Sequence, residues 1–462
     1  MKYLTADFGS TYTKLAAIDA TKAKIIATST AFTTIETDVM EGYNFALQQL
    51  ENEIGGEFKY DQLLCCSSAA GGLKMVALGL VPELTAKAAK MAASSAGAKV
   101  IKTYAFEISK AEQNEIFEIN PDLILLCGGT DGGNKDVIIS NAKKLCEIDR
   151  SFSTIVAGNK SAANEVELVF SESGKDYVIT ENVMPEFNKL NIEPAKQKIK
   201  ELFISKIIDA KGLHNVQQMT NSEIIPTPLA VLNGCELLSK GTASIAGLGD
   251  LMAIDIGGAT TDVYSISAGT PTFDNVMIKG LPEPYNKRSV EGDLGMRYSL
   301  TSLADEVDLE ALSIEVKVDV DDIVNWIDIC KTTPNTLAEK NSINQTIEEG
   351  LAKYALKLAV ERHTGKVETT FTPFGQMYIV SGKDLSQVKL IIGIGGVLVN
   401  SINPTNILGG AKADSQNLMV LKPKQPKYML DRKYIFASMG LLSTIDKDLA
   451  LTIMKNEIRY IQ

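Results

Sequence analysis

Short apolar runs alternate with longer segments of helical spacing along most of the chain, a pattern that predicts a mixed α/β protein. Two of the apolar runs, residues 3–6 and 251–254, have an unusual continuation. Each run breaks into glycines and hydroxyl residues and then resumes as a second apolar run, at residues 15–18 and 263–264. Each pair of runs therefore predicts a strand that turns back through a glycine-rich hairpin and continues as a second strand.

The two predicted hairpins carry the residue types that bind phosphate. Glycines let backbone N–H groups face one point, and hydroxyl side chains add donors around it. A carboxylate at the end of the first strand repels an anion, so an aspartate there indicates a divalent cation between the two. For either copy taken alone, an ordinary glycine-rich hairpin is the alternative interpretation. The candidate residues are Asp7, Gly9, Ser10, Thr11 and Lys14 in the first hairpin, and Asp255, Gly257, Gly258, Thr260 and Thr261 in the second.

A third glycine-rich turn follows a strand that is predicted to begin at residue 390. Gly393, Gly395 and Gly396 lie at the end of that strand, just before a predicted helix. Because no side chain intervenes, the backbone there can approach a flat adenine or ribose closely. One such turn says little, whereas three glycine-rich elements in this order point to a nucleotide site.

The order of these elements resembles the actin-like ATPase superfamily, which includes actin, hexokinase, acetate kinase and a class of heat-shock chaperones. In those proteins two phosphate loops, an adenosine loop and two connecting helices follow one another along the chain. Here the connecting helices are predicted at residues 228–240 and 434–443. The resemblance implies an α/β, ribonuclease H-like fold of two lobes that binds ATP and Mg²⁺ in a hinged cleft.

Between the first two hairpins the chain carries a segment that is extra to such a core. We expect alanine-rich helices over residues 73–96 and a further helix at 137–147, alternating with strands at 99–104, 122–127 and 154–157. This alternation predicts a small parallel sheet covered on both faces. The predicted domains are residues 1–69 for the N-terminal part of the first lobe, 70–190 for an inserted α/β subdomain, 191–248 for connecting helices of the first lobe, 249–433 for the second lobe, and 434–462 for C-terminal helices that return to the first lobe.

Another glycine-rich loop lies inside the predicted subdomain, at the carboxyl end of one of its strands, where open α/β sheets bind ligands. One interpretation is a ligand or partner site, which the density of glycines favours. The other is a turn between a strand and a helix, with Asp131 or Asn134 capping the helix. The residues of this loop are Gly128, Gly129, Thr130, Asp131, Gly132, Gly133 and Asn134.

Composition narrows the functional classes. The 462 residues carry a formal net charge of −11, which argues against nucleic acid because phosphate backbones need clustered Lys and Arg. No apolar run approaches the roughly 18 residues of a membrane span, and the N-terminus lacks the apolar core of a signal peptide. Six cysteines without a C-x-x-C motif predict reduced thiols, and two histidines argue against a zinc site. We expect a cytoplasmic protein.

Several segments outside the nucleotide loops are similar to the glutamate mutase (methylaspartate mutase) accessory proteins called MutL or GlmL, which are unrelated to the DNA mismatch-repair protein of the first name. The resemblance spans essentially the whole chain, and the glycine-rich loop at 128–134 is its most specific part. Ile394 departs from the family pattern at a position where a small or hydroxyl residue is also expected to serve. The similar segments are residues 66–73, 126–134, 182–186, 290–295 and 392–396.

This resemblance implies an ATP-dependent chaperone, or reactivating factor, for an adenosylcobalamin-dependent mutase, with glutamate mutase as the expected client. It implies a weak or partner-stimulated ATPase. The inserted subdomain, which is extra to the ATPase core, is the segment that we expect to contact the mutase.

The expected roles within the nucleotide site follow the same resemblance. Asp7 and Asp255 would hold Mg²⁺ mainly through water, and Lys14 would neutralise phosphate charge. Asp255 is the first candidate for orienting the attacking water, and Glu291 is the second. The backbone segments expected to surround the nucleotide are residues 9–11 and 257–260 at the phosphates and residues 393–396 at the nucleoside.

Three other functions stay open at this point. A small-molecule kinase uses the same fold, although no residue here can be assigned as its catalytic carboxylate. An ATP-dependent activator of a radical dehydratase has a very similar first loop and a cluster shared between subunits, for which Cys127 and Cys235 could be proposed as ligands. Filament formation like that of actin is the third.

Overall fold

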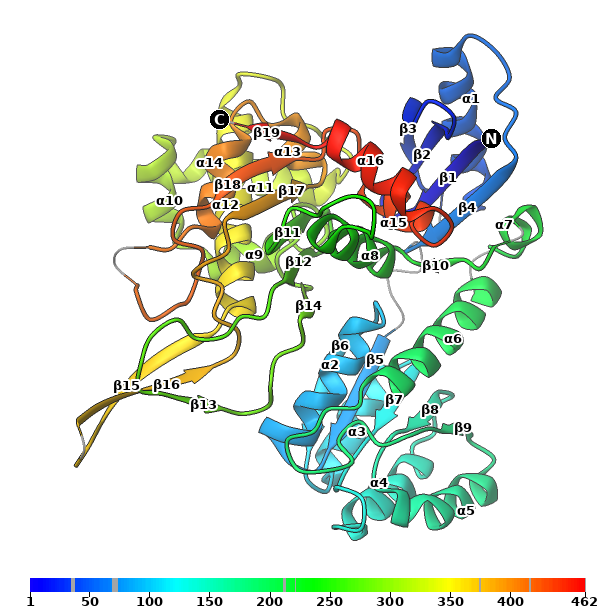
Figure 1. Ribbon diagram of the computed structural model, residues 1–462, viewed down its shortest axis with the longest axis vertical. Coiled ribbons are helices and arrows are strands. Elements are labelled where there is room, and N and C mark those ends of the chain that lie inside the picture. The colour runs from blue at the N-terminus through cyan, green and yellow to red at the C-terminus, as the bar shows by residue number, and fades with distance from the viewer. Residues whose placement is uncertain are drawn as a thin grey trace.

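The computed structural model describes residues 1–34, 38–68, 74–210, 213–220, 222–373, 375–414 and 417–461, with the backbone alone for residues 207–210. Within these ranges the chain forms three large sheets and one small sheet, joined by helices (Figure 1). Of the family-like segment at 66–73, residues 69–73 fall outside the described part of the chain.

The first lobe is built on a five-stranded sheet in the order β10-β4-β1-β2-β3. Strands β1, β2 and β3 are antiparallel neighbours, and β4 and β10 extend the sheet in parallel on the other side of β1. Helix α1 covers one face, and its first turn is capped by the side chain of Asp38. These elements are β1 (Lys2–Phe8), β2 (Tyr12–Asp19), β3 (Lys24–Phe32), α1 (Val39–Ile54), β4 (Gln62–Ser67) and β10 (Ile225–Pro226).

The second lobe repeats this arrangement. Its sheet has the order β14-β12-β11-β17-β18-β19, in which three antiparallel strands are again followed by two parallel ones and then by an antiparallel edge strand. The same order found twice in one chain confirms the predicted actin-like, ribonuclease H-like fold. The strands are β11 (Leu251–Ile256), β12 (Thr261–Ile266), β14 (Asn286–Glu291), β17 (Leu390–Ile394), β18 (Lys427–Leu430) and β19 (Arg459–Ile461).

Helices α8 (Thr227–Lys240) and α15 (Phe436–Leu442) lie between the lobes, close to the two segments where the sequence predicts connecting helices (Figure 1). Their backbones are in direct contact, since a Cβ atom at Gly440 would collide with the carbonyl group of Ala230. Helix α15 also packs on β1 and β4, and it is followed by α16 (Lys447–Glu457) and then by β19 in the second-lobe sheet. The C-terminal segment therefore contacts both lobes.

A third sheet, formed by residues between the first two hairpins, occupies the lower half of Figure 1. Its five strands are all parallel and have the order β6-β5-β7-β8-β9, with helices on both faces. This is the inserted α/β subdomain that the sequence predicts. Its elements are β5 (Lys74–Gly79), α2 (Lys87–Ser95), β6 (Lys99–Ala105), α3 (Lys110–Ile119), β7 (Leu123–Leu126), α4 (Asp136–Cys146), β8 (Ser153–Val156), α5 (Ala163–Ser173) and β9 (Asp176–Ile179), followed by α6 (Glu193–Ala210).

The predicted helix over residues 73–96 is wrong in its first part. Residues 74–79 form β5, which lies between β6 and β7, and α2 begins only after a π-helical turn at Pro82–Ala86. Met75, Val76 and Leu78 are fully buried, because both faces of a parallel sheet are covered. A short continuous apolar run of this kind cannot be told from a buried helix by its periodicity.

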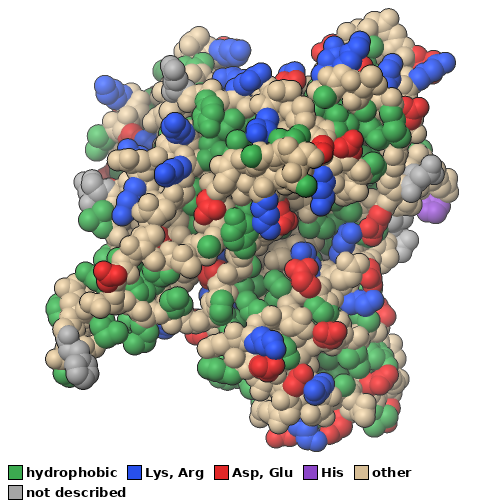
Figure 2. Space-filling view, in the orientation of Figure 1, with side chains coloured by type: hydrophobic (Ala, Val, Ile, Leu, Met, Phe, Trp, Pro, Cys, Tyr) green, Lys and Arg blue, Asp and Glu red, His purple; other side chains and the backbone are tan. Residues whose placement is uncertain are grey.

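The remaining elements belong mostly to the second lobe and to an arm that extends from it (Figure 1). The arm is a three-stranded sheet in the order β13-β16-β15, and hydrophobic side chains show on its surface in Figure 2. Among the described residues, no helix combines the length and the apolar character that crossing a membrane requires. These elements are α7 (His214–Met219), β13 (Val276–Lys279), α9 (Leu300–Glu306), α10 (Leu309–Val316), α11 (Val320–Thr332), α12 (Ile343–His363), β15 (Lys366–Thr372), β16 (Gly375–Ser381), α13 (Gly396–Asn400) and α14 (Pro404–Leu408).

Candidate functional site

A cavity of about 590 Å³ lies where the two lobes and the inserted subdomain meet. Both glycine-rich hairpins and the third glycine-rich turn line it, together with Gly97 and Lys99 of the inserted subdomain. Segments that are hundreds of residues apart in the sequence thus form one site. The predicted site residues that line this cavity are Asp7, Gly9, Ser10, Thr11, Lys14, Asp255, Gly257, Gly258, Thr260, Gly395 and Gly396.

The first hairpin joins β1 to β2. Asp7 is the cross-strand partner of Lys14, and the Lys14 ammonium lies 3.6 Å from one Asp7 carboxylate oxygen. The turn between them is closed by the Gly9 amide, which donates to the carbonyl of Tyr12 at 3.1 Å. Gly9 has no room for a side chain, since a Cβ atom there would lie 2.6 Å from that same carbonyl oxygen.

The second hairpin joins β11 to β12 with the same geometry. Asp255 is the cross-strand partner of Asp262, and the Gly257 amide donates to the carbonyl of Thr260 at 2.9 Å. Asp255 and Gly257 therefore stand in the second lobe where an aspartate and a glycine stand in the first. The position opposite the aspartate, however, is a second carboxylate rather than an ammonium.

The turns of the two hairpins lie side by side. A Cβ atom at Gly258 would lie 3.4 Å from the hydroxyl oxygen of Thr11. That hydroxyl is buried and has no hydrogen-bond partner among the described residues. Because an unpaired buried hydroxyl costs free energy and such groups normally find a partner, its position between two hairpins indicates a ligand that accepts hydrogen bonds, such as a phosphate oxygen.

Three carboxylates surround Lys14 at the base of the cavity. Burial opposes the charge on the Lys14 ammonium, but the nearby Asp7, Asp255 and Asp431 carboxylates outweigh this effect and raise its pKa. Asp7 is almost fully buried, and its carboxylate also accepts a hydrogen bond of 2.6 Å from the hydroxyl of Thr227 at the start of α8. Lys14 is therefore held as a cation where phosphate charge would need neutralising.

At Asp255, by contrast, the surroundings disfavour the charged form of the side chain. Burial raises the pKa of its carboxyl to about 6, with further contributions from Asp262, Asp7 and Asp431 that Lys14 only partly offsets. A half-buried carboxylate in the cavity wall that is short of positive charge suits a bound cation. Among the described residues, no group of three or more His, Cys, Asp or Glu is arranged to hold a metal ion. The carboxylates present fit Mg²⁺, which usually binds through one or two carboxylates, water and substrate phosphates rather than a protein cage.

The third glycine-rich turn forms another part of the wall. Gly395 has a φ of +110°, and a Cβ atom there would collide with the carbonyl of Ile256 at the end of β11. Only glycine fits this approach of one strand end to the other. The cavity lining also includes apolar residues from neighbouring segments, namely Pro334, Leu337, Ala338, Val397 and Val399. A flat, partly apolar group such as a nucleoside suits this end of the cavity.

Three of the predicted residues do not line the cavity. The Thr261 hydroxyl donates to the carbonyl of Leu294 at 2.6 Å, on the opposite side of β12 from the cavity-lining Asp262. Gly393 lies against Leu398 and Leu408 in the core. Glu291, expected as the second candidate for orienting water, is held instead by the guanidinium of Arg362 at 3.0 Å. Its position does not support that role, and we drop the assignment.

Several site residues were not predicted from the sequence. The side chains of Thr227, Asp262 and Arg288 line the cavity, as does Tyr434, whose ring lies 5.4 Å from the Lys14 ammonium. Asp431 lies beside them and accepts the amide of Phe436 at 2.9 Å. One signal existed for Asp262, which stands in the second hairpin at the position of Lys14 in the first. The others come from segments with no phosphate-binding pattern.

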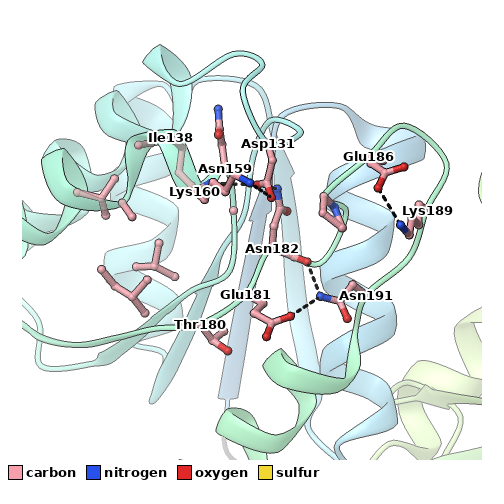
Figure 3. A pocket seen from close by; sticks show the side chains of 17 residues that line it. Asp131, Ile138, Asn159, Lys160, Thr180, Glu181, Asn182, Glu186, Lys189 and Asn191 are labelled. Atoms are coloured by element: carbon pink, nitrogen blue, oxygen red, sulfur yellow. Dashed lines mark hydrogen bonds and ion pairs between the residues drawn. The ribbon is translucent and has the colours of Figure 1, made fainter.

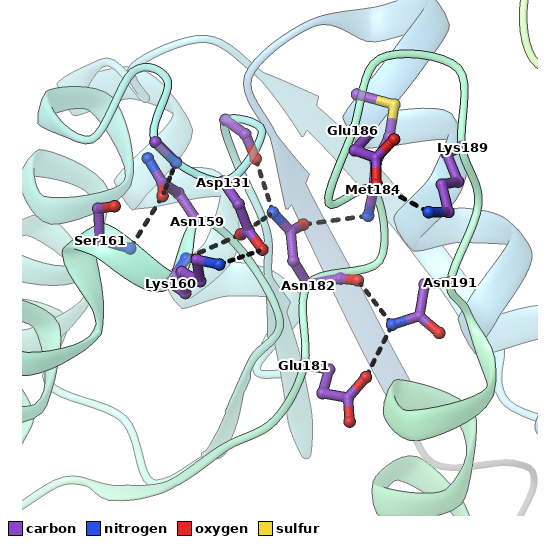
Figure 4. Close-up of polar contacts among 12 residues, drawn as sticks. Asp131, Asn159, Lys160, Ser161, Glu181, Asn182, Met184, Glu186, Lys189 and Asn191 are labelled. Atoms are coloured by element: carbon purple, nitrogen blue, oxygen red, sulfur yellow. Dashed lines mark hydrogen bonds and ion pairs between the residues drawn. The ribbon is translucent and has the colours of Figure 1, made fainter.

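The glycine-rich loop at 128–134 follows β7 at the carboxyl edge of the inserted sheet, and none of its residues lines this cavity. Figure 4 shows the polar contacts around the loop. The buried amide of Asn159 shapes it, accepting from the backbone N–H of Gly132 and donating to the carbonyls of Gly133 and Asn134. Asn134 in turn accepts the amide of Val137 in the first turn of α4 at 3.3 Å, although the residue at the N-cap position is Lys135. Much of the loop's unusual composition is thus explained by its own backbone contacts.

A second buried amide, that of Asn182, holds the other side of the loop. It donates to the carbonyl of Gly129 and to the carboxylate of Asp131, which also accepts the amide of Lys160. A separate cavity of about 430 Å³ lies beside these groups (Figure 3), and its lining includes the apolar residues Ile138 and Val166. The side chains of Asp131 and Asn182, which line this cavity, are hydrogen-bonded to each other. A role of this loop in ligand or partner binding stays a prediction.

Comparison with known proteins gives matches over nearly the whole chain. A family model described as MutL protein matches residues 3–458. The chain belongs to the MutL protein family. It is 46% identical over 456 residues to Protein MutL of Clostridium tetanomorphum, and the match covers 98% of each chain. The resemblance that the sequence segments indicated is therefore confirmed at the level of the family.

Solved structures match this MutL-family chain with low similarity. One match is the activator of 2-hydroxyisocaproyl-CoA dehydratase from Clostridium difficile with bound ADPNP. It is 11% identical with a TM-score of 0.31, and the match covers 100% of both chains. Gluconate kinase from Lactobacillus acidophilus is 10% identical with a TM-score of 0.35, and the match covers 100% of this chain and 92% of the kinase. Similarity at this level carries no argument about function.

Proposed function

We propose that this MutL-family protein is an ATP-dependent chaperone, or reactivating factor, for an adenosylcobalamin-dependent mutase, and that glutamate mutase is its client. One observation carries the nucleotide part of the proposal: two equivalent aspartate–glycine hairpins meet at one cavity and leave the Thr11 hydroxyl there without a partner among the described residues. Family membership and the sequence resemblance support the choice of client.

In this proposal, the residues that line the cavity contact different parts of Mg-ATP. Backbone amides and hydroxyls of the two turns surround the phosphates, and Lys14 offsets their charge. Asp7 and Asp255 would hold Mg²⁺, mainly through water, and the bound ion would supply further positive charge for the phosphates. Gly395 and Gly396 let the backbone approach the nucleoside. Each of these residues lines the same cavity.

Hydrolysis needs positioning and charge stabilisation more than covalent help from the protein. Asp255 lies in the cavity wall, and its raised pKa of about 6 leaves it ionised at neutral pH while keeping it a competent proton acceptor. We assign it the task of orienting the attacking water. Loss of the last phosphate would release contacts to both hairpins at once and let the lobes part about α8 and α15.

The alternative functions receive no specific support. Cys127 and Cys235, which could have been cluster ligands, are 1% and 0% exposed and belong to separate cores, and burial raises the pKa of both thiols. A cluster shared between subunits needs accessible thiolates. For a kinase, the cavity would have to hold a second substrate beside a catalytic carboxylate other than the aspartates already assigned to Mg-ATP.

The proposal is tested by measuring ATP hydrolysis with and without glutamate mutase that has been inactivated by turnover. We expect hydrolysis to rise with damaged mutase and mutase activity to recover. Lys14→Met should weaken ATP binding about 100-fold, because a cation buried among carboxylates and phosphates is lost. Lys59→Met, which changes an exposed lysine, is the matched control. Hydrolysis that ignores the mutase would contradict the assigned client, and ATP binding that survives Lys14→Met would contradict the site.

A further inference from the structure

Helix α2 of the inserted subdomain is held at both ends by the second lobe. At its N-terminal end the ammonium of Lys87 lies 2.8 Å from a carboxylate oxygen of Glu283, which precedes β14. Glu283 is itself nearly buried and also pairs with Lys287 at 3.0 Å. This end of α2 therefore bears on a partly buried charge cluster rather than on an exposed surface ion pair.

At the C-terminal end of α2 the contact is made by Arg288 of β14. One of its guanidinium nitrogens donates to the carbonyls of Ser94 and Ala98, at 3.2 and 3.4 Å. The last carbonyls of a helix lack partners within the helix, and the helix dipole favours a cation there. Arg288 supplies such a cation from the other lobe, in addition to the Gly97 amide that already donates to Ser94, and its side chain is only 3% exposed.

The same arginine binds the second phosphate hairpin. Its Nε and Nη2 atoms lie 2.8 and 2.6 Å from one carboxylate oxygen of Asp262. The other oxygen of Asp262 accepts a hydrogen bond of 3.1 Å from the hydroxyl of Thr260, in the turn of the hairpin. A planar guanidinium has enough donors to bind a carboxylate and two carbonyls together. An unbroken series of contacts thus runs from the phosphate turn to α2.

We propose that Asp262 and Arg288 are positioning residues that transmit the state of the phosphate site to α2 and, through α2, to the inserted sheet. This inference rests on the proposed nucleotide function and names how that site would be regulated. Helix α2 packs against β5, β6 and β7 on one side and against β14 on the other. A change at Thr260 therefore has a route into the subdomain that does not pass through the helices between the lobes.

Because of how the chain connects the subdomain to the two lobes, movement of the lobes must affect α2. The subdomain is inserted between strands of the first lobe, yet α2 is bonded to the second lobe at both ends. When the lobes move relative to each other, α2 must leave the second lobe, shift against its own sheet, or carry the whole subdomain along with the second lobe. In each case, nucleotide-driven movement changes the surface or the position of the subdomain.

Hydrogen–deuterium exchange of the full-length protein, with and without Mg²⁺ and a non-hydrolysable ATP analogue, tests the inference. In the wild type we expect the analogue to change exchange by about threefold or more in both α2 and residues 257–260. In Arg288→Lys, compared at saturating analogue, the response at 257–260 should persist and the response in α2 should be lost. A purely structural role of Arg288 would not separate the two responses.

A second variant keeps the inference testable if Arg288→Lys fails to fold. Lys87→Met releases the other end of α2 and lies outside the cavity, so it should reduce the α2 response while analogue affinity stays unchanged. Lys135→Met, which breaks an ion pair of 2.7 Å within the subdomain, is the matched control and should keep the full response. An α2 response that is absent in the wild type, or that survives both test variants, overturns the inference. Failure of the wild type to bind the analogue overturns the proposed function itself.

Discussion

The two phosphate hairpins share one backbone geometry, and they differ in the residue opposite the aspartate. In the first hairpin Asp7 faces Lys14, whose ammonium points into the cavity. In the second, Asp255 faces Asp262, whose carboxylate is neutralised by an arginine from the neighbouring strand. The difference indicates two roles for one duplicated motif. The first hairpin carries its own cation at the cavity, whereas the carboxylate of the second is connected through Arg288 to the inserted subdomain.

This difference also makes the second hairpin depend on the first. Lys14 is the cation that lowers the pKa of Asp255, against burial and three other carboxylates. The two residues come from different lobes, so the ionisation of Asp255 is sensitive to how closely the lobes approach. Electrostatic interactions of this kind weaken as the charges separate.

The largest effect is expected where the second hairpin is connected to the subdomain. Arg288→Met removes the cation and leaves Asp262 buried without it, and breaking a buried pair in this way typically costs about 3–5 kcal/mol. We expect a loss of that size in the free energy of unfolding, measured with urea.

A double variant separates the pair from the packing around it. Asp262→Asn combined with Arg288→Met no longer leaves an unpaired charge, so it should recover a large part of the lost stability. If the double variant is as unstable as Arg288→Met alone, the contacts of Arg288 with α2, and not its charge pair, carry the effect.

A second, smaller effect is expected at Asp255. Because burial raises the pKa of this carboxyl to about 6, the folded state favours its protonated form. Its contribution to stability is therefore complete below about pH 4, the ordinary aspartate range, and is lost as the pH rises through about 6. Without Mg²⁺, Asp255→Asn should raise the free energy of unfolding by about 1–3 kcal/mol at pH 8, and the gain should vanish near pH 4.

The same variant should lose the ability to hydrolyse ATP. Asp255 would then be a residue that lowers the stability of the protein but is needed for its function. Urea unfolding at the two pH values provides the measurement. Glu57→Gln changes an exposed carboxylate and should shift stability by less than about 0.5 kcal/mol at either pH. A variant that is less stable than the wild type at pH 8 would contradict the electrostatic account.

The hairpins were predictable from the sequence because their chemistry is local. An aspartate, a glycine two residues later and hydroxyls in the turn specify both the backbone and the ligands within one short segment. The fold class followed from finding this segment twice. Strand β5 was missed for the opposite reason, since its apolar run carries no period that distinguishes a buried strand from a buried helix.

The rest of the site depends on tertiary contacts that no local pattern reports. Arg288 lies in a charged segment with no motif, and its role appears only when β14 pairs with β12 and α2 packs beside it. Thr227 reaches Asp7 from the start of α8, and Asp431 lies at the end of β18, where it accepts the amide of Phe436 at the start of α15. Glu291 was expected to orient water from its place in a charged, family-like segment, but in the structure its carboxylate pairs with the guanidinium of Arg362.

The smallest expected effect tests the first hairpin at a single hydroxyl. Thr11→Val removes a buried group that lacks a partner among the described residues, so it should leave the unliganded protein as stable as the wild type or up to about 1–2 kcal/mol more stable. ATP affinity should fall by about tenfold or somewhat more, the value of one hydrogen bond to a charged phosphate oxygen. Thr13→Val is the matched control two residues away, because that buried hydroxyl is already bonded to Thr33 at 3.0 Å. It should destabilise the protein and leave ATP affinity unchanged. If both valine variants lower stability and neither changes affinity, the Thr11 hydroxyl does not face the ligand, and the hairpins would have to hold the phosphates through backbone amides and Lys14 alone.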